Sequence, residues 1–180
     1  MWLIGAFGSE SLPSACFWNP DPVGKHRPMS DYPRAVIKTE HGDITVELWS
    51  DVAPNHVENF LKLARDGFYD GLNFHRVVPD FVIQGGCPNG DGTGGPGWNV
   101  DAEFNDREHH PGTLSMARAA DPNSAGSQFF ICLTRENCRH LDGQYTGFGQ
   151  VTEGMDIVNE IAAAGQAGRQ PAMHGIQPLD

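Results

Sequence analysis

Apolar residues in this chain alternate with other residues in short runs, and glycines and prolines separate the runs. In the run DITVELW, Ile44, Val46 and Leu48 occupy every second position. This period places them on one face of a half-buried β-strand. The chain holds 22 Gly and 13 Pro, a content that favours many short elements joined by turns over long helices. The pattern therefore predicts a mainly β fold.

The alternating runs predict how the strands follow one another. His41-Gly42 separates RAVIKTE from DITVELW, and a two-residue turn that ends in glycine predicts a hairpin there. The two-residue period returns after Gly71. It predicts further strands at residues 73–78, 81–84, 113–117, 128–133 and 148–151.

Two segments show the period of a helix instead. The first begins near Pro54, stops at Gly67, and has one apolar face made of Val57, Phe60, Leu61 and Ala64. The second is expected over residues 153–164, with Thr152 as its N-cap and Gly165 at its end. Its apolar face consists of Met155, Val158, Ile161 and Ala162. Many short strands with two helices predict an antiparallel sheet that closes, or nearly closes, into a barrel.

The length of 180 residues predicts one domain. Residues 1–31 contain many prolines and show no periodicity, so we expect a poorly ordered extension, with Met29 as an alternative start. The domain is expected at residues 32–165. Residues 166–180 show no clear strand pattern, and we expect them to form a C-terminal tail.

Charge and composition exclude several classes of function. The net charge is −11 and Lys and Arg form no cluster, which argues against binding to nucleic acid or to an anionic membrane. No apolar run approaches the roughly 20 residues of a membrane span, and the N-terminus lacks the basic start of a signal peptide. The four cysteines form no C-x-x-C pair, which favours free thiols in a reducing compartment. We expect a cytoplasmic monomer.

Three motifs suggest chemistry that their context does not support. GDGTGG matches a dinucleotide-binding pattern, but Pro96 follows where a helix should begin, so a surface loop is expected. His109-His110 lacks metal-ligand spacing and is interpreted as part of a solvated loop. Cys87 with His75 is a weak candidate for a thiol nucleophile. No metal or cofactor is expected.

Arg76 is a more informative residue, because it interrupts the apolar run FHRVVPDFVIQGG. Strand alternation places Arg76 on one face with Phe74 and Val78. A charge between apolar neighbours suits a groove that binds a partly apolar ligand, although an arginine that extends to water is the simpler interpretation. The stretch GTLSMARAADPNSAGSQFFI is rich in small residues, which let a peptide backbone come close.

These two stretches, together with HLDGQYTGFGQV, resemble the three signature blocks of the cyclophilin-type peptidyl-prolyl isomerases, in the same order and with similar spacing. The resemblance covers residues 32–164. It implies a closed, eight-stranded antiparallel β-barrel capped by two helices, and we expect its last strand to be weak because AMHGIQPLD is poor in apolar residues. It also implies cis–trans isomerisation of the bond before proline, without metal or cofactor.

The resemblance implies a role for eleven residues of this sequence. Arg76, Phe81 and Gln84 match catalytic positions. Substrate-binding positions are matched by Val82, Ala117, Arg118, Gln128, Phe130, His140, Leu141 and Tyr145, of which Val82, Phe130 and Leu141 join Phe81 as walls of the proline pocket. His140 replaces a tryptophan found in many members, Tyr145 a histidine, and Arg118 an asparagine. The first two changes keep a ring but predict weak cyclosporin binding.

Two functions follow as alternatives. The first is an enzyme that accelerates rotation about X–Pro bonds in peptides and in unfolded or flexible protein loops. The second is a non-catalytic module that binds proline-containing segments of a partner protein. The presence of Arg76, Phe81 and Gln84 together favours the enzyme.

Overall fold

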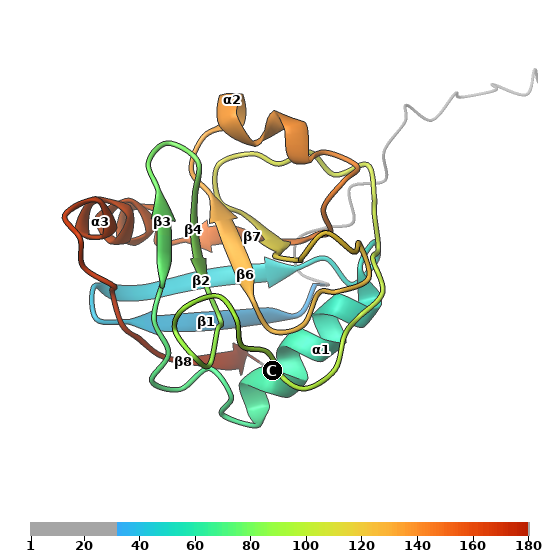
Figure 1. Cartoon of the computed structure of the whole chain (residues 1–180), viewed down its shortest axis with the longest axis horizontal. Helices are drawn as coiled ribbons and strands as arrows, with labels where there is room; N and C mark the ends of the chain where they lie inside the picture. The colour runs from blue at the N-terminus through green and yellow to red at the C-terminus, as the bar shows by residue number, and fades with distance from the viewer. Residues whose placement is uncertain (1–31, 180) are drawn as a thin grey trace, which may run out of the picture.

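The computed structural model describes residues 32–179, which form an eight-stranded sheet with helices around it (Figure 1). The extension expected at residues 1–31 lies outside the described residues. The strands are β1 (Arg34–Thr39), β2 (Gly42–Leu48), β3 (Arg76–Val78), β4 (Val82–Gly85), β5 (Thr113–Met116), β6 (Phe129–Cys132), β7 (Gly147–Glu153) and β8 (Met173–Leu179). The helices are α1 (Pro54–Arg65), α2 (Arg135–Cys138), the 3-10 turn η2 (Arg139–Leu141) and α3 (Met155–Gln166).

The predicted hairpin and the five later strands are all present. β1 and β2 pair antiparallel up to Thr39 and Gly42, and strands β3 to β7 lie within three residues of the predicted bounds. β3 is the shortest of them because the residues before it bond elsewhere: the Phe74 N–H donates to the carbonyl of Pro171.

The C-terminal segment is a strand and not the expected tail. β8 pairs antiparallel with β1 along its whole length, from Arg34 opposite Leu179 to Thr39 opposite Met173. A register shift at Thr39 breaks the two-residue period, so that Met173 and Ile176 are both buried although they are three positions apart. That irregularity hid the strand in the sequence, and it extends the folded domain to residue 179.

The sheet is strongly curled and almost closes on itself. Its strand order is β3-β4-β6-β5-β7-β2-β1-β8, with every neighbouring pair antiparallel. Over residues 32–179 the two edge strands, β3 and β8, form no ladder with each other. The edges meet before these strands begin, through a bridge between Asn73 and Ala172. The expected closed barrel is therefore an open, eight-stranded antiparallel sheet joined at one point.

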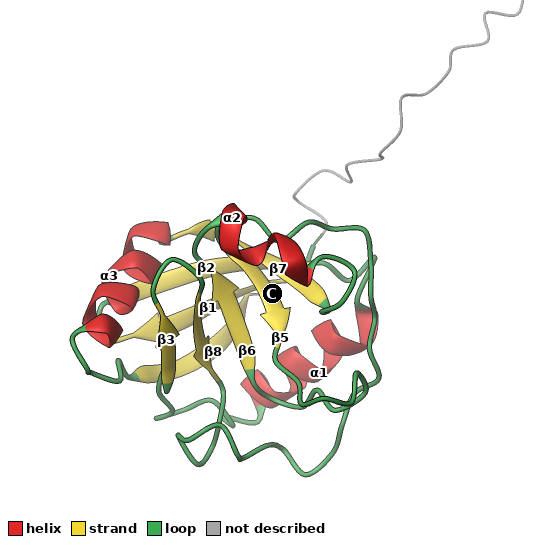
Figure 2. Ribbon diagram, turned by 45° about the horizontal axis from the view of Figure 1, so that its top comes forward, coloured by secondary structure: helices red, strands yellow, loops and turns green. Residues whose placement is uncertain are grey.

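Helices α1 and α3 lie at opposite sides of this sheet (Figure 2). The predicted apolar face of α1 is buried, and Phe60 packs there against Tyr69, Phe129 and Phe148 with ring centroids 5.2–5.5 Å away. No helix within the described part of the chain is long and apolar enough to span a bilayer.

Helix α3 begins and ends later than predicted. Strand β7 continues to Glu153, so Gly154, with φ of 89°, is the N-cap in place of Thr152. Gly165 lies inside the last turn and does not end the helix. A Cβ at this position would overlap the side chain of Val77 on β3, so the missing side chain lets α3 pack directly against the edge strand.

Candidate active site

Three polar side chains form a continuous chain across the strands that carry the predicted site. Arg76 on β3 lies opposite Gln84 on β4, and its Nη1 donates to Oε1 of Gln84 at 3.2 Å. Nε2 of Gln84 donates to Oε1 of Gln128 at 3.0 Å. The first of these residues is exposed and the two glutamines are half-buried. The guanidinium is therefore held at the surface by a row of amides.

An apolar wall lies beside this polar chain. Its buried members belong to a cluster separate from the main core, consisting of Val82, Phe130, Cys132, Cys138 and Leu141. Phe81, Ala117 and Tyr145 pack on the cluster from the solvent side. The His140 ring stacks on Phe81, with ring centroids 5.5 Å apart. The wall can therefore receive a small apolar ring next to the Arg76 guanidinium.

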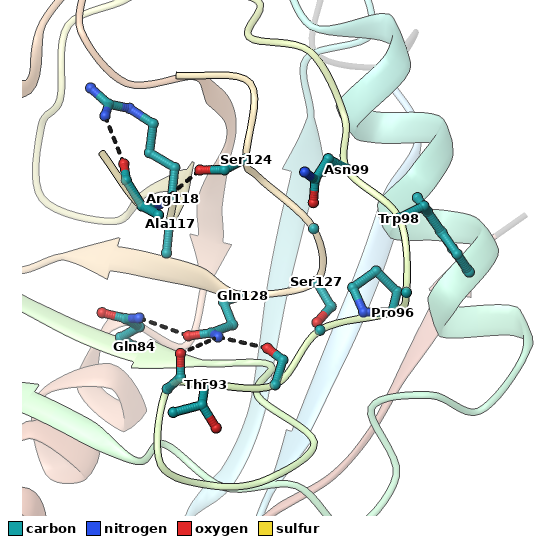
Figure 3. Close-up of a pocket in the computed structure, with 16 residues that line it drawn as sticks. Gln84, Thr93, Pro96, Trp98, Asn99, Ala117, Arg118, Ser124, Ser127 and Gln128 are labelled. Carbon is teal, nitrogen blue, oxygen red and sulfur yellow. Dashed lines mark hydrogen bonds between the residues drawn. The ribbon is translucent and has the colours of Figure 1, made fainter. Parts of the chain in front are cut away.

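A cavity of about 610 Å³ opens on the other side of the amides (Figure 3). Its lining includes Gln84, Thr93, Trp98, Ala117, Arg118 and Gln128. Ala117 contributes both to this cavity and to the apolar wall. The cavity and the wall therefore form two adjoining parts of one groove, with Gln84 between them.

The loop that contains GDGTGG borders this groove, and hydrogen bonds to Gln128 and Cys87 hold it in place. Nε2 of Gln128 donates to the carbonyls of Gly92 and Gly94 at 2.9 and 2.8 Å. The buried Sγ of Cys87 accepts the N–H groups of the same two glycines at 3.2 and 3.3 Å. Burial raises the pKa of the Cys87 thiol, but hydrogen bonds from the backbone of this loop, led by that of Gly94, outweigh this effect, so the pKa lies below its ordinary value. The thiol anchors the loop and is not placed as an accessible nucleophile.

His109 was expected in a solvated loop, but it is buried beneath the apolar wall. Its side chain is 1% exposed, whereas the neighbouring His110 is 57% exposed. Nδ1 of His109 lies 3.1 Å from Oδ1 of Asp142, and Nε2 lies 2.9 Å from Oγ of Ser115. Burial lowers the pKa of His109, and Asp142 opposes part of that shift. The three residues resemble a catalytic triad, but Ser115 is fully buried and no substrate can reach it.

Arg135 completes this network beside one end of the apolar wall. Its Nη2 donates to Oδ2 of Asp142 at 2.7 Å. Desolvation alone would raise the pKa of Asp142, but hydrogen bonds from Arg135 and His109 outweigh it and lower the pKa to about 2. Because Asp142 follows Leu141 directly, the network holds that wall residue in place. The sequence did not predict this network, because spacing along the chain does not show which residue will pair with a buried histidine.

All eleven residues predicted for the site lie along this groove. Arg76, Gln84 and Gln128 form the polar chain; the apolar wall contains Phe81, Val82, Ala117, Phe130, His140, Leu141 and Tyr145. The side chain of Arg118 packs over Tyr145 at the rim. Within residues 32–179, no group of three or more His, Cys, Asp or Glu side chains could hold a metal ion.

Comparison with known proteins shows which family this chain resembles. The family model described as cyclophilin type peptidyl-prolyl cis-trans isomerase/CLD matches residues 34–177. A peptidyl-prolyl cis-trans isomerase of Synechococcus elongatus is 55% identical over 130 residues, which cover 71% of this chain and 88% of the relative. Peptidyl-prolyl cis-trans isomerase B of Bacillus subtilis is 50% identical over 121 residues, covering 66% of this chain and 82% of the relative.

A solved structure extends the comparison to three dimensions. The crystal structure of a Cryptosporidium parvum cyclophilin type peptidyl-prolyl cis-trans isomerase, in the presence of the dipeptide Ala-Pro, has a TM-score of 0.75 and 32% sequence identity. The match covers 82% of this chain and 99% of that chain. Family model, sequence relatives and fold agree with the three signature blocks, and the chain belongs to the cyclophilin-type peptidyl-prolyl cis-trans isomerase family.

Proposed function

We propose that the groove carries out the isomerase reaction of this family with Arg76 as its central catalytic residue. The observation that carries the proposal is the hydrogen bond from Arg76 to Gln84, which holds a guanidinium beside an apolar wall. Proline-containing peptides are the substrates, and unfolded segments or flexible loops of proteins are their proposed source. The monomeric state and the cytoplasmic location stay predictions.

The chemistry of the X–Pro bond explains why such a groove is enough to catalyse its rotation. The amide nitrogen shares its lone pair with the carbonyl, and the resulting barrier to rotation is roughly 18–20 kcal/mol. Uncatalysed exchange takes tens to hundreds of seconds. No bond is broken during rotation, so the reaction needs neither a nucleophile nor a general base. It needs a site that stabilises the twisted amide more than the planar one.

Arg76 can provide that stabilisation through its guanidinium. As the bond twists, the nitrogen becomes pyramidal and regains its lone pair, which can accept a hydrogen bond. A charge-assisted hydrogen bond contributes on the order of 1.5–3 kcal/mol, which corresponds to roughly ten- to a hundredfold in rate. The bond to Gln84 orients Arg76 before the substrate arrives, so less entropy is lost in the transition state.

The apolar wall provides the second contribution. A planar amide is more dipolar than a twisted one, so a site of low polarity disfavours the planar ground state. Phe81, Phe130 and Leu141 line this side of the groove, and they also suit the apolar proline ring. We expect Gln84 to bind the carbonyl side of the same peptide bond.

One experiment distinguishes the proposed enzyme from a module that only binds proline-containing segments. Exchange NMR on a short Ala-Pro peptide reports both the cis–trans exchange rate and, through shift changes, binding. The proposed function predicts faster exchange at a protein concentration far below that of the peptide. Shift changes without any change in exchange rate would support the binding module instead.

A further inference from the structure

Arg118 lies at the rim of the groove, where it belongs to the lining of the cavity. In Figure 3 its side chain extends from the segment after β5, away from Gln128. Its Cζ lies 4.4 Å from the centroid of the Tyr145 ring. A guanidinium at this distance forms a cation–π contact with the face of the ring.

The guanidinium also joins two loops through hydrogen bonds. Nη1 of Arg118 donates to the carbonyl of Ala119 at 3.0 Å and, at 3.4 Å, to that of Ala120. Nη2 donates to the carbonyl of Gln144, at 3.0 Å. No carboxylate of residues 32–179 forms an ion pair with this arginine. Its donors are thus used to connect the loop after β5 with the loop that carries Tyr145.

In this position one hydrogen-bond donor of Arg118 has no acceptor. Its Nε is buried and has no hydrogen-bond partner among the described residues. A buried donor without an acceptor is unfavourable. The arginine nevertheless keeps this position, in which its Cζ lies over the ring of Tyr145. The ring contact and the hydrogen bonds of the Nη groups together hold the guanidinium there.

Tyr145 transmits the position of Arg118 to the proline pocket. Its ring packs edge-on against Phe130, with centroids 5.9 Å apart and an interplanar angle of 73°. Phe130 is 5% exposed and belongs to the apolar wall. A line of contacts therefore runs from Arg118 at the rim, through Tyr145, to the wall that faces the proline ring.

We propose that Arg118 is a positioning residue that holds Tyr145 against Phe130 and thereby sets the affinity of the groove for proline-containing peptides. The inference rests on the proposed function of this groove as the peptide site. It differs from a direct contact with the peptide, because the Nη groups of Arg118 are already bound to loop carbonyls. When Arg118 is removed, Tyr145 gains freedom that peptide binding must take away again.

The expected kinetic signature is a change in binding without a change in chemistry. Arg118→Met keeps an unbranched side chain but removes the charge and the planar group. It should weaken peptide binding by about three- to thirtyfold, the range of a cation–π contact. KM should rise by the same factor while kcat stays unchanged, because the planar and twisted forms of the peptide lose the same contact. Arg118→Lys should fall between the wild type and Arg118→Met, because an ammonium group can lie over the Tyr145 ring but cannot bond to both loops as the planar fork does.

A double-mutant cycle with Tyr145→Leu tests whether Arg118 acts through the tyrosine. Calorimetry with an Ala-Pro peptide gives Kd, and exchange NMR gives kcat and KM, for both single variants and the double variant. We expect Arg118→Met to have no further effect on Kd once Tyr145 is leucine. Arg169→Met, at an exposed arginine outside the groove, serves as the charge-matched control and should leave all three quantities unchanged.

Several results would overturn the inference. Additive effects in the cycle would mean that Arg118 does not act through Tyr145. A loss confined to a peptide with Glu beside the Ala-Pro unit would mean direct charge recognition. Unchanged Kd in both Arg118 variants, with an active wild type, would mean that the side chain has no role in affinity. A wild type that binds peptide without accelerating exchange would instead refute the proposed catalysis, and the cycle in Kd would still test Arg118.

Discussion

Arg76 and Gln84 face each other across β3 and β4, and their side chains join at 3.2 Å between Nη1 and Oε1. The pairing depends on strand register, because a slip of one residue would turn Arg76 to the opposite face of the sheet. β3 has three residues, so the neighbouring strand determines where the guanidinium points. The geometry of the proposed catalytic residues is thus set by backbone pairing as well as by the choice of arginine.

Arg76→Ala should reduce kcat by roughly ten- to a hundredfold while peptide affinity changes far less. The reason is that the guanidinium is proposed to bind a lone pair that exists mainly in the twisted amide. The fold should hold, because Arg76 is exposed and its removal leaves no cavity in the core. Exchange NMR on an Ala-Pro peptide measures the rate, and circular dichroism verifies folding.

Two further variants sharpen this test. Arg76→Lys should also be poor, since a point charge on a flexible stem does not keep the bond to Gln84 in the same geometry. Arg65→Ala, at an exposed arginine on α1, should retain full activity. If folded Arg76→Ala isomerised the peptide at the rate of the wild type, the proposed role of the guanidinium would be refuted and the binding-module alternative would gain support.

Gln128→Leu should lower kcat/KM by roughly five- to a hundredfold, the range expected from losing one to three hydrogen bonds of about 1 kcal/mol each. The substitution leaves Gln84 without its acceptor and releases the carbonyls of Gly92 and Gly94. Arg76 should then be oriented less firmly, and the loop that borders the cavity should become more mobile. Gln177→Leu, at an exposed glutamine on β8, provides the matched control. Equal kcat/KM values for the two variants would show that the row of amides has no function.

His140→Trp should tighten cyclosporin binding and leave turnover of short peptides broadly unchanged. His140 stacks on Phe81 at an interplanar angle of 30°, so a larger ring at this position would extend the apolar wall. An indole also adds an N–H donor suited to a ligand carbonyl. Calorimetry with cyclosporin measures the gain, and an affinity equal to that of the wild type would count against a place for residue 140 at the pocket edge.

Much of the fold could be predicted because the core strands obey simple periodicity. The alternation of Ile44, Val46 and Leu48 and the helical spacing of Val57 and Phe60 correspond to residues that are almost fully buried. β8 could not be found in this way, because its register shift separates Met173 and Ile176 by three positions. Local patterns predict strands with regular pairing and miss those whose pairing is irregular.

The site was less predictable than the fold, and the reason is its dependence on distant partners. The apolar run around Arg76 marks this residue as unusual, but its catalytic role is implied only by the family resemblance, and no spacing rule links it to Gln128. The buried state of His109 depends on Asp142, which lies 33 residues away in the sequence. Two adjacent histidines in a polar stretch carry no sign of such a partner, so the sequence alone favoured a solvated loop.

The network of His109 and Asp142 predicts how stability changes with pH. Burial lowers the pKa of His109 in the folded state, whereas the unfolded chain has a histidine pKa of about 6.5. Below that value the unfolded state binds a proton that the folded state does not, so the histidine lowers stability as pH falls. Asp142 acts in a separate, more acidic window, because its carboxyl contributes stability that is lost as pH falls from its ordinary pKa of 3.8 toward about 2.

His109→Gln should therefore make the free energy of unfolding less dependent on pH as the pH falls below about 6.5. Glutamine can keep a hydrogen bond to Asp142 or to Ser115 but cannot take up a proton in this range. Urea unfolding at closely spaced pH values gives the slope for the wild type and for the variant. His110→Gln changes the neighbouring histidine, whose side chain is 57% exposed, and should keep the slope of the wild type. If His109→Gln kept that slope as well, the buried imidazole would not be the group whose protonation opposes folding in this range.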